Sequence, residues 1–266
     1  MKPADFGAGQ SPRRVEDGRF LRGKGRYTGD LAFAHEAHGT VLRSPHAHAR
    51  LAAIDTRATA AMPGVLAVLT GEDVAADGLG DLPCMDPVAG RDGRPCFVPP
   101  SPLLTRDRVR HVGDRVAFVV AESLAQARDA AERIAVEYEP LPAVADTAAA
   151  LDGSAPRLWG EAPGNLCVDW ALGDEAAVEA AFARADRVTR LSLVNNRLVA
   201  ASMEPRGAIG EYDPGTGRYT LHAGCQGVHN LQRWIAEPVL RVPPGHLRVL
   251  CPDVGGGFGI DRKSVV

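Results

Sequence analysis

Residues 116–140, VAFVVAESLAQARDAAERIAVEYEP, decide the fold class of this chain, because they predict a strand, a helix and a second strand. The apolar run 116–121 is typical of a buried strand. Ser123 is a favourable helix N-cap. After it, apolar residues recur at helical spacing, at Leu124, Ala127, Ala131 and Ile134. Residues 135–139 alternate between apolar and polar and end at Pro140, which predicts a half-buried strand.

An earlier part of the chain has the same order of elements. Residues 39–44 predict a strand that ends before a proline. Asp55 is placed to cap a helix over residues 56–61, and residues 65–70 form a short apolar strand. Two strand–helix–strand units predict a compact mixed α/β (α+β) domain over residues 25–145.

Composition divides the rest of the chain. Residues 74–104 are rich in Gly, Pro and Asp without a clear period, which predicts a long loop inside the first domain. The full division is an N-terminal arm over 1–24, the α/β domain over 25–145, a linker over 146–164, a second domain over 165–260 and a tail over 261–266.

The second domain is also predicted to be mixed. Asp174 is placed to cap a helix whose apolar face contains Val178, Ala181, Phe182 and Ala185. Residues 231–240 predict another helix, limited by Pro238. The predicted strands are 188–194, 218–223 after the turn 213–217, and 247–251.

Composition excludes several functional classes. The 266 residues carry a net charge of -3 with scattered basic residues, which argues against nucleic-acid binding. No apolar run approaches the length of a membrane span, and the N-terminus has no apolar signal core. The five cysteines include no Cys-x-x-Cys pair, which argues against a disulfide scaffold, a zinc site or a bound iron–sulfur cluster. We therefore expect free thiols in a cytoplasmic protein.

The glycine run 255–259, GGGFG, is the sharpest candidate for a binding site. It follows the predicted strand 247–251 directly. Consecutive glycines cost backbone entropy, but they allow a backbone to approach a ligand closely and to offer N–H groups to an anion. A flexible loop is the alternative. A nucleotide site is disfavoured, because no Gly-x-Gly-x-x-Gly opens a helix and no P-loop lysine follows.

The other polar candidates are weaker on their own. Gln226 follows a strand among small residues and could present its amide to a ligand, although the residues alone favour a solvated turn. Residues 204–206, Glu-Pro-Arg, are typical of a strand entry with a surface charge pair. His46 and His48 form His-x-His without a third ligand at a supporting spacing, so we predict no metal site formed by side chains.

Several of these stretches, taken in order, resemble the molybdopterin-binding large subunit of the xanthine dehydrogenase, aldehyde oxidase and aerobic carbon monoxide dehydrogenase family. They are PRRVED (12–17), LRGKGRY (21–27), SPHAHA (44–49), VGDRVA (112–117), EYEPLP (137–142), Glu204-Pro205-Arg206, Gln226 and the glycine run. The resemblance covers nearly the whole chain. It implies that the first domain is the family's small hammerhead domain and that the second is the start of its cofactor-binding domain.

The family resemblance also implies a chemistry. The family's large subunit hydroxylates an aldehyde, an N-heterocycle or carbon monoxide, with water as the oxygen source and molybdenum taking two electrons. The implied cofactor is molybdenum-molybdopterin in its cytosine dinucleotide form. Gln226 would hydrogen-bond an oxo ligand of the metal, and Gly255, Gly256, Gly257, Phe258 and Gly259 would pass close to the metal and pterin. No side chain here would bind the metal directly. Because no iron–sulfur or flavin segment precedes the arm, an iron–sulfur small subunit and an FAD-binding medium subunit are the implied partners.

The sequence departs from the family after Gly259. Residues 260–261 are Ile-Asp where the family has any residue and then lysine, and the family's general-base glutamate in Gly-x-Gly-Glu has no counterpart. Residues 261–266, DRKSVV, match one frame of a sequencing adapter, so we expect an artefactual tail on an N-terminal fragment. The fragment alone is expected to be inactive. The alternative function is a non-catalytic module that binds partner subunits.

Overall fold

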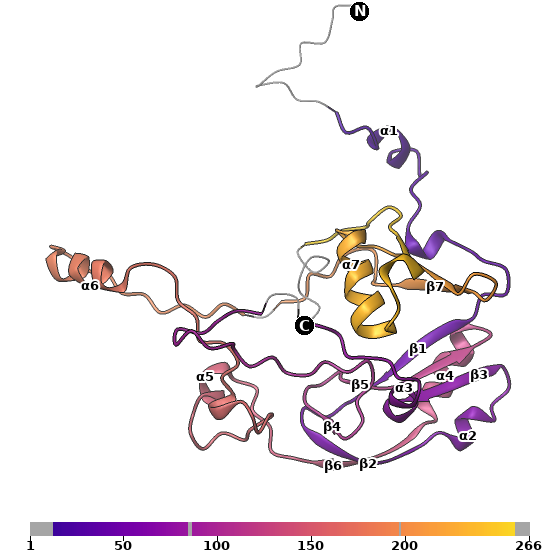
Figure 1. Cartoon of the computed structure of the whole chain (residues 1–266), viewed down its shortest axis with the longest axis horizontal. Helices are drawn as coiled ribbons and strands as arrows, with labels where there is room; N and C mark the ends of the chain where they lie inside the picture. The colour runs from indigo at the N-terminus through magenta and orange to yellow at the C-terminus, as the bar shows by residue number, and fades with distance from the viewer. Residues whose placement is uncertain (1–12, 85–86, 197, 259–266) are drawn as a thin grey trace, which may run out of the picture.

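The computed structural model describes residues 13–84, 87–196 and 198–258 (Figure 1). Its strands are β1 (His38–Arg43), β2 (Ala49–Asp55), β3 (Val65–Thr70), β4 (Arg108–Val109), β5 (Arg115–Ala121), β6 (Ala135–Pro140), β7 (Ala208–Asp213), β8 (Arg218–Ala223) and β9 (Leu247–Leu250). Its α-helices are α1 (Asp17–Phe20), α2 (Arg57–Ala60), α3 (Gly71–Ala76), α4 (Leu124–Glu132), α5 (Thr147–Ala150), α6 (Glu175–Arg184) and α7 (Val228–Ile235). The short helical turns are η1 (Thr28–Asp30), η2 (Pro163–Asn165), η3 (Ala236–Leu240) and η4 (Pro244–His246).

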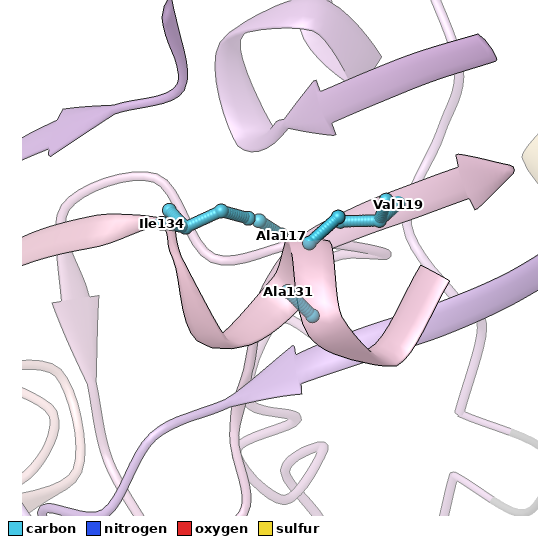
Figure 2. Packing of buried hydrophobic residues seen from close by; sticks show 5 residues of the cluster. Ala117, Val119, Ala131 and Ile134 are labelled. Carbon is cyan, nitrogen blue, oxygen red and sulfur yellow. The ribbon is translucent and has the colours of Figure 1, made fainter. Parts of the chain in front are cut away.

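The strand–helix–strand unit that decides the fold class is confirmed. β5 lies between β1 and β3 and is antiparallel to both. α4 packs on this sheet and begins at Ser123, whose hydroxyl accepts from the N–H of Gln126 at 3.3 Å, as predicted. Sheet and helix share a core whose buried members are Ala117, Val119, Ala130, Ala131 and Ile134 (Figure 2). Small alanines allow α4 to lie close to β5.

A second sheet completes the first domain. Its order is β4-β2-β6, with both pairs antiparallel. The sequence predicted β6 but not β2. The prediction that Asp55 caps the next helix is wrong, because Thr56 takes the N-cap position. Asp55 ends β2 instead, and its carboxylate accepts from the backbone N–H of Arg57 at 3.0 Å.

The third sheet, β7-β8-β9, belongs to the second part of the chain. β7 and β8 form an antiparallel hairpin around the predicted turn, and β9 lies parallel to β8. α7 packs on β9, and Ala236, Leu247 and Val249 are buried in their shared core. The helix predicted over 231–240 begins earlier, at Val228, and changes at Ala236 into the wider π-helical turn η3. Pro238 lies within this turn and has no N–H for a regular α-helix.

The predicted loop 74–104 connects the two parts of the chain. Its first residues belong to α3, which the sequence did not predict. The N–H of Gly80 donates to the carbonyl of Val239 at 2.9 Å. The N–H of Arg91 donates to the carbonyl of Asp169, also at 2.9 Å, and the two side chains form an ion pair. These polar contacts hold the loop against segments more than 75 residues away.

The segment that carries α6 lies away from the three sheets (Figure 1). The helix is confirmed, and the carboxylate of Asp174 accepts from the N–H of Ala177 at 2.9 Å. Its apolar face is exposed, with Phe182 56% accessible. The strand predicted over 188–194 is wrong, because no described segment pairs with these residues and a strand needs a neighbour. No helix among the described residues is both long and apolar enough to cross a membrane.

The buried face of β5 should dominate the stability of the first domain. Val119 is fully buried in the centre of β5, whereas Leu66 on β3 is 58% exposed. Val119→Ala removes two buried methyl groups and leaves a cavity, so we expect a loss of about 2 kcal/mol in the free energy of unfolding. Leu66→Ala should change it by less than about 0.5 kcal/mol. Urea unfolding of both variants measures the difference, and equal losses would contradict this assignment of the core.

Candidate functional site

The candidate site lies where β8 and β9 end. Because the two strands are parallel, the residues that follow them emerge at the same edge of the sheet. The segment after β8 leads to Gln226, and the segment after β9 leads to the glycine run. The two segments touch: the Cys251 thiol contacts the backbone of Cys225, at 3.1 Å from its carbonyl oxygen. The structure therefore brings together two features that are 29 residues apart in the sequence.

The glycine run has a backbone that side chains would obstruct. Gly256 has φ +124°, which residues other than glycine rarely adopt, and a Cβ there would lie 2.6 Å from Cε2 of Phe258. Phe258 has φ +48°, a left-handed conformation that costs a residue with a side chain about 1 kcal/mol or more. Its ring is 76% exposed. Strain of this kind is typical of functional sites.

Two backbone donors of the run remain available. The N–H of Gly255 donates to the Glu204 carboxylate at 2.6 Å. No carbonyl or side chain in the described part of the chain accepts from the N–H of Gly256 or Gly257. Successive unpaired N–H groups next to a backbone that lacks Cβ atoms suit an anionic group with several oxygens. Gly259, the last predicted residue of the run, lies outside the described residues, as does the predicted tail 261–266.

Gln226 is exposed at a bend between β8 and α7. Gly227 follows it with φ +143° and acts as the N-cap of α7. The Gln226 amide has no hydrogen-bond partner among residues 13–84, 87–196 and 198–258. Its donor and acceptor atoms are therefore available to a ligand at this edge of the sheet.

Glu204 has a larger role than its sequence motif suggested. The interpretation of 204–206 as a strand entry with a surface charge pair does not describe its carboxylate, which is partly buried. One oxygen accepts from the N–H of Gly255 and the other from the N–H of Thr28, at 3.3 Å. Glu204 thus connects the glycine run to a residue 176 positions earlier in the chain.

Asp253, two residues before the run, fixes the N-terminal arm and the residues that follow it to the same edge. Its carboxylate accepts two hydrogen bonds from the guanidinium of Arg19 and one from the backbone N–H of Arg26, at 2.7 Å. Its own N–H donates to the carbonyl of Arg26 at 2.8 Å. The Arg19 hydrogen bonds, followed by that from Arg26, lower the pKa of Asp253 from 3.8 to about 2. The sequence did not predict this clamp.

The histidines of the first domain have other partners. His46 packs against the ring of Tyr138, with 4.7 Å between ring centroids. His48 is buried, and its Nδ1–H donates to the carbonyl of Pro142 at 2.7 Å. These contacts support a structural role for the two side chains in closing the first domain.

Two family models together match most of the chain. The model of the aldehyde oxidase and xanthine dehydrogenase a/b hammerhead domain matches residues 22–142. The model of the molybdopterin cofactor-binding domain matches residues 158–265, which include Gln226 and the glycine run. The chain belongs to the aldehyde oxidase and xanthine dehydrogenase family. The hammerhead domain contains the first two sheets, and the third sheet lies in the cofactor-binding domain.

Individual proteins of the family are similar over nearly the whole chain. The carbon monoxide dehydrogenase large chain of Afipia carboxidovorans is 34% identical over 95% of this chain, and the nicotine 6-hydroxylase large subunit of Paenarthrobacter nicotinovorans is 35% identical over 94%. The crystal structure of quinoline 2-oxidoreductase from Pseudomonas putida 86 matches 95% of this chain with a TM-score of 0.80 and 36% identity. The chain spans 31%, 30% and 31% of these three proteins, respectively.

The Asp253 clamp should depend on charge. Asp253→Asn removes the carboxylate, so we expect several-fold faster amide hydrogen exchange in residues 19–30 at pH 7. Because folding lowers the pKa of Asp253 from 3.8 to about 2, its contribution is complete above about pH 4 and is lost as the pH falls through 2. The control is Asp92→Asn, which changes an exposed carboxylate whose partners are the backbone N–H and the side chain of Arg94. Unchanged exchange in Asp253→Asn would refute the clamp.

Proposed function

We propose that this chain is the N-terminal part of the large subunit of a molybdenum hydroxylase. The observation that carries the proposal is the edge of the third sheet, where the segments that lead to Gln226 and to the glycine run contact each other through Cys225 and Cys251. The N–H groups of Gly256 and Gly257 donate to no acceptor among the described residues, and the Gln226 amide is exposed. These donors fit a molybdopterin cofactor, which is rich in oxygen atoms and negative charge. The match to the cofactor-binding family model supports the same assignment.

Each residue has a defined task in this proposal. Gly255 and Gly256 let the backbone approach the cofactor, and Gly256 and Gly257 donate hydrogen bonds to its oxygens. Gln226 would donate its amide N–H to the bound cofactor, and Phe258 would extend the same surface. Gly259, predicted to do the same, lies outside the described residues. When bound, molybdenum-molybdopterin would accept two electrons from the substrate carbon while water supplies the oxygen atom. The general base would come from another part of the complete protein, so residues 1–266 alone should be inactive.

The substrate, cofactor form and partners are finer parts of the proposal. We infer an aldehyde, an N-heterocycle or carbon monoxide as substrate and the cytosine dinucleotide form of the cofactor. The similar proteins include large subunits and one named as a subunit of a 6-hydroxypseudooxynicotine dehydrogenase complex. They support assembly with an iron–sulfur small subunit and an FAD-binding medium subunit. No disulfide joins the five cysteines, which supports a cytoplasmic location.

The decisive test is the metal content of the complete gene product. We expect about one molybdenum per large subunit by mass spectrometry, with cytosine nucleotide released on denaturation. Gly256→Ala should lower the molybdenum content at least several-fold, because a positive φ costs alanine about 1–2 kcal/mol and its Cβ would strike Phe258. Gly210→Ala on β7, where a Cβ meets no atom within 4 Å, should retain the metal.

Either of two results would count against the proposal. A complete gene product without molybdenum would favour the alternative, a module that binds partner subunits without catalysis. Full molybdenum content in Gly256→Ala would instead show that the glycine run does not hold the cofactor.

A further inference from the structure

Glu204 joins two backbone segments that are distant in the sequence. Its Oε2 accepts from Gly255 at 2.6 Å, a short bond typical of a charged acceptor. Its Oε1 accepts from Thr28, a residue that is only 5% exposed, at 3.3 Å. One carboxylate therefore fixes the start of the glycine run against the first residues of the hammerhead domain.

The packing around Glu204 is close enough to explain why Gly255 must be a glycine. A Cβ on Gly255 would overlap Cβ of Glu204 and would lie 3.3 Å from its backbone nitrogen. The hydroxyl of Ser202 donates to the Glu204 carbonyl at 2.8 Å. A Cβ on Gly256 would lie 3.3 Å from Cβ of Ser202. Residues 202–204 thus form a support along the first two residues of the glycine run.

The carboxylate also lies near the strand end that leads to Gln226. A Cβ on Gly224 would lie 3.8 Å from Oε2 of Glu204 and 3.8 Å from Val254. The environment of Glu204 therefore includes both segments that form the candidate site.

We propose that Glu204 is a positioning residue for the molybdenum cofactor. Glu204 determines which N–H group of the glycine run is the first one available to the ligand. By accepting from Gly255, it leaves the N–H groups of Gly256 and Gly257 as the next donors. Glu204 also links the position of these N–H groups to Thr28, near the start of the hammerhead domain. This inference rests on the proposed function, because it assigns Glu204 a task at the same site.

The task requires a carboxylate rather than a neutral amide. Both oxygens of Glu204 accept from N–H groups. A glutamine has one oxygen, and its NH2 group would face the second N–H, so one of the two segments would lose its acceptor. An aspartate keeps both oxygens and the charge on a shorter side chain. Since the backbones at positions 204 and 255 are in close contact, the aspartate should retain part of the interaction.

The experiment compares Glu204→Gln, Glu204→Asp and the control Glu179→Gln in the complete gene product. Glu179 is exposed on α6 and makes no hydrogen bond or ion pair among the described residues. Two quantities are measured: the rate of molybdenum loss during dialysis, and hydrogen exchange of peptides containing Thr28 and Gly255 in the cofactor-free protein. Glu204→Gln should lose molybdenum about 10- to 100-fold faster and exchange faster in both peptides. Glu204→Asp should fall between wild type and Glu204→Gln, and Glu179→Gln should match wild type.

The outcomes separate the two proposals. Wild-type protein that contains no molybdenum overturns the proposed function and, with it, the cofactor role of Glu204. Wild-type protein that holds molybdenum and a Glu204→Gln variant that loses it no faster overturn the role of Glu204 alone. If Glu204→Gln does not fold, Glu204→Asp decides the question: faster molybdenum loss than wild type, with both peptides affected, supports the role, and unchanged loss overturns it.

Discussion

The parallel pairing of β8 with β9 is the constraint on which the candidate site depends. Parallel strands need a long connection between them, and here α7, η3 and η4 provide it while covering their shared core. The pairing directs both strand ends to one edge of the sheet. Backbone that is irregular at this edge can then face a ligand while the strands behind it stay rigid. Gln226 and the glycine run acquire a common location only through this topology.

The edge itself is organised by carboxylates rather than by apolar packing. Asp253 and Glu204 both accept backbone N–H groups from the segment 26–28. Asp253 lies two residues before the glycine run, and Glu204 contacts the first residue of the run. These contacts involve Asp253 and Gly255, on either side of Val254, and they limit how far the run can move relative to residues 26–28. An apolar contact would allow more sliding, because dispersion has little directionality, whereas hydrogen bonds to a charged acceptor are directional.

The elements with strong local signals were predictable from the sequence. α4 has a serine cap and apolar residues at helical spacing, and β3, β5, β8 and β9 are apolar runs bounded by turn residues. β2 was missed because alanine, arginine and aspartate give it no clear alternation. Residues 188–194 have the opposite problem. Their composition favours a strand, but pairing is a tertiary property, and no described segment supplies a partner.

The candidate site was predictable in its parts but not in its connections. The glycine run is visible in the sequence because consecutive glycines cost backbone entropy, and a close approach to a ligand is one reason to bear that cost. Gln226 gained meaning only from the family resemblance. The contacts of Asp253 with Arg19 and of Glu204 with Thr28 span 234 and 176 residues. A single sequence has no signal for such pairs, because each member looks like an ordinary surface charge or a turn residue.

The polar character of these long-range contacts has a consequence for how the two domains work together. The connection through the loop 74–104 relies on backbone hydrogen bonds from Gly80 and Arg91, and the connection through the arm relies on Asp253 and Glu204. The two domains joined in this way keep separate apolar cores among the described residues. The position of the glycine run still depends on both connections. The hammerhead domain and its arm therefore help to fix the geometry of the candidate site, although their side chains provide none of the proposed ligand contacts.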